Sequence, residues 1–149
     1  MLCPYLITDH AACLSLFESN RPKYFLASER ADYEAFLGRV EREQRPYFVL
    51  ERGGEAVACG GVGYEVHPTL AYLSWGMVRG DLHGCRLGSE LTCSRLNWLR
   101  QHWPEVQRVK IDTSQHTEAF YARFGFVVVE RITDGFGVGL NQVKMVAAL

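Results

Sequence analysis

Residues suited to binding an anion are concentrated in the segment Met77–Ser89, where an apolar run passes through a polar turn into a helical pattern. The free N–H groups of a helix start carry about half a unit of positive charge. Gly84 and Gly88 would let an oxygen approach the backbone without meeting a Cβ. Arg79 and Arg86 add planar guanidinium donors that suit phosphate. Such spacing also occurs in ordinary turns before helices, so by itself it predicts only an anion site.

A second group with chemical potential is the tyrosine in the segment Asp112–Phe126. Four residues of this segment share one face of an expected helix: Thr117, Phe120, Tyr121 and Phe124. On this pattern alone, Tyr121 is interpreted as a core aromatic residue whose hydroxyl is satisfied locally.

The elements that would position these segments follow from residue periodicity. Helices are predicted between Thr8 and about Glu43 with a break at Asn20–Pro22, from Leu87 to Pro104, and at Gln115–Phe124, where Ser114 can cap. Strands are predicted at Tyr47–Glu51, Ala56–Tyr64, Leu70–Val78, Val106–Asp112, Phe126–Arg131 and about Val138–Val146. Helices, an antiparallel meander, and then strands interspersed with helices predict one α/β domain over residues 1–149 with a mixed sheet.

Composition excludes several classes of protein. The 16 Lys and Arg residues nearly balance the 17 Asp and Glu residues, so no field is expected to recruit nucleic acid or an anionic membrane. No apolar run approaches the roughly 20 residues of a membrane span. The five cysteines include no Cys-x-x-Cys pair, which favours reduced thiols in a cytoplasmic protein, and the histidines show no metal-ligand spacing.

Two motifs carry a resemblance to a known family. The segment His83–Gly88 resembles motif A of the GNAT superfamily of acyl-CoA-dependent N-acyltransferases, (Gln or Arg)-x-x-Gly-x-(Gly or Ala). His83 stands where Gln or Arg is usual, and Arg86 where the middle Gly is usual. The segment Tyr121–Phe126 resembles motif B, Tyr-x-x-(Leu or Phe)-Gly-Phe, at the expected distance after motif A. The resemblance spans roughly Pro46 to Leu149, and more loosely the N-terminal helices.

The resemblance implies the GNAT fold, an α/β fold (α+β in some schemes) with a mixed, mostly antiparallel sheet of six to seven strands flanked by about four helices. It implies acetyl-CoA as cosubstrate and no metal. The acetyl group would pass to a primary amine of a small molecule, amino acid or peptide by direct attack in a ternary complex. Since the family often pairs through sheet edges or the C-terminal strand, a homodimer is a further expectation. The alternative is a non-catalytic acyl-CoA-binding sensor or interaction module, which needs no acid.

The resemblance also implies roles for individual residues. Tyr121 is expected to protonate the departing thiolate, because the matching tyrosine in the family points at the cofactor sulfur. The main chain of Met77 and Val78 is expected to bind pantetheine, with Val78 polarising the thioester carbonyl. Glu65 is the general-base candidate, and a water chain is the alternative. The other residues expected at the cofactor are Arg79, His83, Gly84, Cys85, Arg86, Leu87, Gly88, Ser89, Ser114 and Phe124.

The acceptor is expected to bind over the N-terminal helices and the loop between Glu65 and Leu70. Aromatic and ionisable residues there could form a pocket: Tyr24, Phe25, Glu29, Tyr64, His67 and Tyr72.

Overall fold

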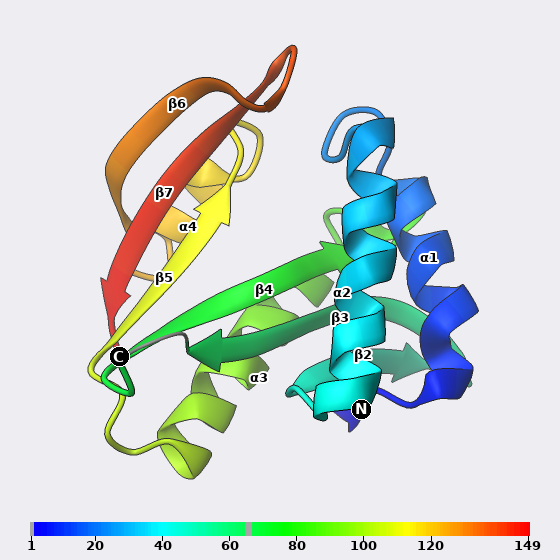
Figure 1. Cartoon of the computed structure of the whole chain (residues 1–149), viewed down its shortest axis with the longest axis horizontal. Coiled ribbons are helices and arrows are strands. Elements are labelled where there is room, and N and C mark those ends of the chain that lie inside the picture. The colour runs from blue at the N-terminus through cyan, green and yellow to red at the C-terminus, as the bar shows by residue number, and fades with distance from the viewer. Residues whose placement is uncertain (1, 65–66) are drawn as a thin grey trace.

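The computed structural model describes residues 2–64 and 67–149, and within them seven strands form one mixed sheet (Figure 1). The strands are β1 (Leu2–Pro4), β2 (Tyr47–Arg52), β3 (Glu55–Tyr64), β4 (Leu70–Val78), β5 (Arg108–Thr113), β6 (Val127–Gly137) and β7 (Leu140–Ala148). Their order across the sheet is β1-β2-β3-β4-β5-β7-β6. β4 and β5 pair in parallel, and the other neighbours pair antiparallel. The predicted mixed sheet is confirmed.

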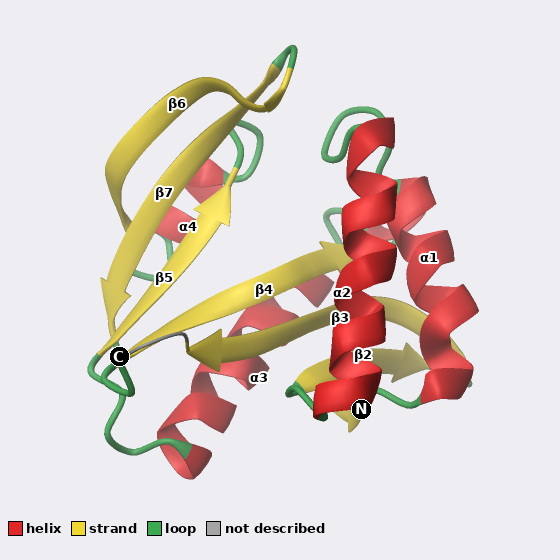
Figure 2. Cartoon of the chain, in the orientation of Figure 1, coloured by secondary structure: helices red, strands yellow, loops and turns green. Residues whose placement is uncertain are grey.

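Helices cover both faces of this sheet (Figure 2). The N-terminal pair α1 (His10–Ser19) and α2 (Arg30–Glu43) lies in front of β2 to β4, whereas α3 (Leu87–His102) and α4 (Glu118–Ala122) lie behind the sheet. Apolar residues of α1 and α2 pack with Val49, Cys59 and Met77 on the first face. Residues of α3 and α4 pack with alternate positions of the same and later strands on the other face. This alternation is what a sheet buried on both faces requires.

The sheet opens between β4 and β5. Pairing covers only Leu70 to Tyr72 on β4 against Arg108 to Lys110 on β5. Beyond that point the two strands diverge like the arms of a V (Figure 1). Near the divergence β4 carries a bulge: Ser74 faces Gly61 and Met77 faces Cys59, so β4 uses one residue more than β3.

Most strand ends differ from the sequence prediction by one or two residues, and three differences are larger. β1 was not predicted, because three residues are too few to show an alternating pattern. β6 continues past Arg131 to Gly137, through a register irregularity opposite β7. The helix predicted at Gln115–Phe124 covers only Glu118–Ala122, and its N-cap is Thr117 instead of the predicted Ser114, whose hydroxyl accepts a hydrogen bond from the His116 N–H at 3.3 Å.

Candidate active site

A cavity of about 820 Å³ lies where β4 and β5 separate. Its walls come from the free part of β4, the first turn of α3, the β5–α4 connection and the segment between α1 and α2. Nine of the residues expected at the cofactor line it: Met77, Val78, His83, Gly84, Arg86, Leu87, Gly88, Ser89 and Ser114. The sequence prediction and the opening of the sheet therefore converge on one place.

The start of α3 presents free amide groups to this cavity. Arg86 occupies the N-cap position without a side-chain cap, and its carbonyl accepts the first intrahelical bond from Glu90 at 3.1 Å. Within the described part of the chain, no backbone or side-chain acceptor meets the N–H groups of residues 86–89. The free donors and partial positive charge of such a helix start are suited to an anionic group such as a pyrophosphate.

Arg86 itself has an unusual conformation. Its φ of 64° lies in the left-handed region, which most side chains avoid and glycine adopts readily. The structure therefore keeps the backbone shape of the glycine that is usual in the motif, and it adds a guanidinium on the cavity wall.

Gly88 places this helix start close to its neighbours. A Cβ on Gly88 would lie 3.3 Å from the Phe120 ring and 3.8 Å from the Val78 side chain. The free amides of α3 thus lie near the end of β4, where a phosphate group and the chain attached to it can both touch backbone. The start of α3 and the end of β4 therefore offer their backbone donors to the same part of the cavity.

The main chain at the end of β4 turns one amide toward the opening. The Arg79 N–H donates to the Val57 carbonyl at 2.8 Å, so Arg79 hydrogen-bonds toward β3. Because successive residues of a strand alternate, the Val78 N–H points away from β3 into the gap, and the Met77 N–H points toward β3. Of the two backbone candidates, Val78 has the geometry for a substrate contact.

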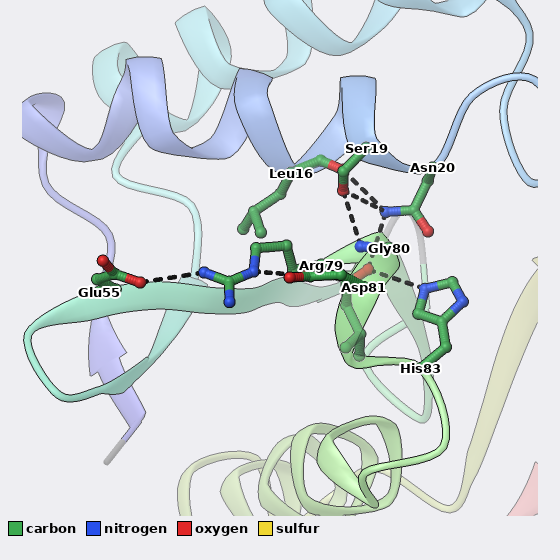
Figure 3. A network of polar contacts seen from close by, with 9 residues as sticks. Leu16, Ser19, Asn20, Glu55, Arg79, Gly80, Asp81 and His83 are labelled. Carbon is green, nitrogen blue, oxygen red and sulfur yellow. Dashed lines mark hydrogen bonds and ion pairs between the residues drawn. The ribbon is translucent and has the colours of Figure 1, made fainter.

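Two side chains fix the Val78 carbonyl (Figure 3). Asn20 Nδ2 donates to it at 2.9 Å, and His83 Nε2 lies 3.0 Å from it. Asn20 is 5% exposed and also donates to the Leu16 carbonyl at 2.8 Å. The Gly80 N–H donates to Ser19 Oγ at 2.9 Å. The last turn of α1 therefore holds the end of β4 and the turn that leads to α3.

Tyr121 lies on the opposite wall of the cavity. Its ring packs edge-on against Phe120 and Phe126, with centroid distances of 5.0 and 5.8 Å, and 8% of the residue is exposed. Its hydroxyl has no hydrogen-bond partner among residues 2–64 and 67–149. The local partner expected for a purely structural tyrosine is absent from this described part, and the hydroxyl can donate to a bound group.

Three predicted cofactor residues lie outside the cavity lining. The Arg79 guanidinium is directed away from the cavity. It donates hydrogen bonds to Asp81 Oδ1 at 2.7 Å and Glu55 Oε2 at 3.1 Å (Figure 3). These hydrogen bonds raise the pKa of Arg79. Cys85 is exposed, and Phe124 packs against Phe120 at 5.2 Å. Glu65, the general-base candidate, lies outside the described residues.

The acceptor side of the cavity contains four of the residues expected there: Tyr24, Phe25, Glu29 and Tyr72. Tyr64 and His67 do not line it. Glu29 is 8% exposed, and its Oε2 accepts a hydrogen bond from the Leu26 N–H at 2.8 Å. Burial raises the pKa of Glu29, although the Leu26 hydrogen bond opposes this shift.

The segment between α1 and α2 lines the cavity and contacts elements on both of its sides. The Tyr24 ring meets His83 edge-on at 4.9 Å and His116 at 5.9 Å, so one side chain contacts both turns that flank the opening. A Cβ on Gly137 would lie 2.3 Å from Leu26, which brings the same segment against the β6–β7 hairpin.

Arg95 is a cavity residue that the sequence prediction missed. It is 1% exposed although it carries a charge. The available signal was its position on α3, four residues from Leu91 and four from Leu99, which places it within the apolar stripe.

Other kinds of site find less support in the described part of the chain. No group of three or more His, Cys, Asp and Glu side chains there could hold a metal ion. None of the helices described is both long and apolar enough to cross a bilayer.

Comparison with known proteins agrees with this geometry. The sequence model of the Acetyltransferase (GNAT) family matches residues 13–126. The chain therefore belongs to the GNAT acetyltransferase family, whose members are acyl-CoA-dependent acyltransferases. No curated protein matches the chain.

Solved structures share the fold at low sequence identity. A ribosomal-protein-alanine N-acetyltransferase from Brucella melitensis superposes with a TM-score of 0.78 and 18% identity, covering 100% of this chain and 99% of that one. A putative GNAT acetyltransferase from Desulfovibrio desulfuricans has a TM-score of 0.83 and 14% identity, with 99% and 98% covered. An aminoglycoside 6'-N-acetyltransferase complexed with coenzyme A has a TM-score of 0.73 and 13% identity, with 99% and 96% covered. These structures are similar to the chain in fold, and the first and third are named for different acceptors.

Proposed function

We propose that this protein transfers the acetyl group of acetyl-CoA to a primary amine of a small molecule, amino acid or peptide, by direct attack in a ternary complex. The observation that carries the proposal is the continuous cavity from the free amides of α3, along the unpaired part of β4, to the hydroxyl of Tyr121. The same cavity extends to the aromatic and acidic residues beside α2, where an amine can approach.

In this proposal the backbone binds and polarises the donor. The N–H groups of residues 86–89 and the Arg86 guanidinium hold the pyrophosphate. The Val78 N–H donates to the thioester carbonyl and strengthens that bond as negative charge develops on the oxygen. Asn20 and His83 keep this amide aimed at the gap because they fix the carbonyl of the same residue.

Tyr121 and Glu29 move the protons. Tyr121 donates its hydroxyl proton to the sulfur as the carbon–sulfur bond breaks and the electron pair leaves with the thiolate. Glu29 accepts the proton that the amine loses, directly or through water, since it is the buried carboxyl on the acceptor wall. A raised pKa suits such a base, because a stronger base takes the proton more readily near neutral pH.

The experiment that tests the function is a screen for thiol release from acetyl-CoA. Suitable acceptors are amino acids, polyamines, aminoglycosides, phosphinothricin and short peptides that begin with alanine, since solved relatives are named for several of these. We expect turnover with at least one amine and a thermal shift with coenzyme A. A shift without turnover on any amine would favour the non-catalytic sensor. Gel filtration of the same sample tests the homodimer.

The substitution Glu29→Gln tests the proton acceptor. We expect kcat/KM to fall at least about tenfold at neutral pH, because the amide cannot take a proton. The wild-type profile should lose activity as Glu29 becomes protonated, with a midpoint above the ordinary glutamate pKa of about 4.3, and the variant should lack this limb. An unchanged profile in Glu29→Gln would exclude Glu29 as the base.

Stability gives a second readout of Glu29. Because burial raises its folded-state pKa, its contribution is favourable when it is neutral and is lost as pH rises through that pKa. Relative to wild type, the free energy of unfolding of Glu29→Gln should therefore rise between about pH 4, near the ordinary glutamate pKa, and about pH 7, well above it. Glu105→Gln, an exposed carboxylate that does not line the cavity, serves as the control.

A further inference from the structure

A buried cation lies beneath the bulge in β4. Arg95 projects from α3, and its Nε and Nη2 have no hydrogen-bond partner in the part of the chain that the structure describes. Its Nη1 makes only long contacts, 3.4 Å to the Gly61 carbonyl and 3.5 Å to the Ser74 carbonyl. None of the ion pairs in this part includes Arg95. A guanidinium stays charged in proteins, and a buried charge without a partner destabilises the fold.

Two glycines make room for this charge. A Cβ on Gly76 of β4 would lie 2.7 Å from Arg95 Nη2, and a Cβ on Gly60 of β3 would lie 3.0 Å from Nη1. The guanidinium therefore occupies the space that side chains of two neighbouring strands would otherwise take. It lies directly under the residues that form the bulge.

The bulge is stabilised mainly by a residue other than Arg95. The Tyr47 hydroxyl donates to the Trp75 carbonyl at 2.8 Å and holds the bulge with a hydrogen bond of ordinary length. The contacts of Arg95 with carbonyl oxygens are at the long limit for hydrogen bonds. What Arg95 adds beyond these contacts is a positive charge in a region of low dielectric.

Arg95 lies on the cavity wall at some distance from the anion site at the start of α3. Arg95 follows Gly88 by seven residues, which corresponds to about 10 Å along the helix axis. The anion site at the helix start and Arg95 thus lie at two levels of the same cavity wall. If the pyrophosphate binds at the upper level, the chain attached to it runs along β4 past Val78 toward the lower level, so that the thioester lies between the helix start and Arg95.

We infer that Arg95 is a positioning residue for the acyl group, whose charge stabilises the negative charge that develops on the thioester oxygen. This inference rests on the proposed function. As the amine nitrogen bonds to the carbonyl carbon, the carbonyl electron pair moves to oxygen and the nitrogen loses a proton to Glu29. The return of that electron pair breaks the carbon–sulfur bond, and the thiolate takes the Tyr121 proton. Arg95 touches none of these atoms, and it acts on them across the bulge by its electric field.

The test measures the carbonyl stretch of bound acetyl-CoA labelled with ¹³C at the carbonyl, by isotope-edited infrared spectroscopy. A positive field along the bond weakens it, so we expect the band of bound donor to lie at lower wavenumber than that of free donor. In Arg95→Met the band should move back toward the free value, while calorimetry shows a Kd for acetyl-CoA within about twofold of wild type. Arg95→Lys, which keeps the charge, should retain most of the shift. Arg100→Met is the control, because Arg100 is exposed on the same helix and bonds Asn97.

The possible outcomes distinguish failure of the role of Arg95 from failure of the proposed acetyltransferase function. Failure of the wild type to bind acetyl-CoA would overturn the proposed function. Binding with an identical band in wild type and Arg95→Met would overturn the role of Arg95 alone. If Arg95→Met does not fold, the carbonyl bands of Arg95→Gln, which is neutral, and Arg95→Lys, which is charged, are compared instead. Once an acceptor is known, kcat of the neutral variants should fall on the order of tenfold or more with the KM for acetyl-CoA nearly unchanged.

Discussion

Replacing Tyr121 with Phe should lower kcat by about 10²-fold or more and leave the affinity for acetyl-CoA nearly unchanged. The substitution removes one oxygen, and that oxygen has no hydrogen-bond partner in residues 2–64 and 67–149. The ring contacts with Phe120 and Phe126 remain, so the fold loses little. Steady-state kinetics with the best amine of the screen and calorimetry with acetyl-CoA give the two quantities.

The control for this experiment is Tyr64→Phe, since Tyr64 is 43% exposed and does not line the large cavity. Its kcat should equal that of wild type. Equal turnover in Tyr121→Phe and wild type would remove Tyr121 from the mechanism and would leave water as the proton source. A joint loss of turnover and acetyl-CoA binding would instead assign Tyr121 to the binding of the donor.

The order of strands and helices was predictable because each element carries its own period. Leu70–Val78 was predicted with the bounds that the structure has, and the Pro22 region separates the two N-terminal helices as expected. The opening of the sheet could not be read from periodicity alone. It depends on pairing that stops at Tyr72 and on the bulge near Trp75, whose φ of 37° no local pattern announces.

The candidate site was predictable where backbone groups would bind the donor, and less predictable where side chains would bind it. Arg79 and Arg86 look equivalent in the sequence, yet Glu55 and Asp81 bind the first and leave the second on the cavity wall. Glu55 belongs to another strand, so its influence is set by tertiary structure. Arg95 is the converse case, because its position within the apolar stripe of α3 indicates burial from the sequence alone.

The substitution Gly80→Ala should weaken both the fold and the donor site. A Cβ on Gly80 would lie 2.2 Å from the Ser19 carbonyl oxygen, which belongs to backbone and can yield only if α1 moves. Gly80 has no positive φ, so this contact, and not backbone strain, is the cause of the effect. We expect a loss of about 1–3 kcal/mol in the free energy of unfolding.

The same clash should reach the donor site, because the last turn of α1 also holds the Val78 carbonyl through Asn20. Moving α1 away from the turn therefore releases the amide aimed at the thioester and shifts the start of α3. Acetyl-CoA affinity should fall about tenfold, equivalent to about 1.4 kcal/mol. The matched control is Gly38→Ala inside α2, where the Cβ meets only the tip of the Arg42 side chain at 3.1 Å. That variant should gain about 0.5–1 kcal/mol of stability with unchanged affinity. Full acetyl-CoA affinity in a destabilised Gly80→Ala would show that α1 supports the fold without positioning the site.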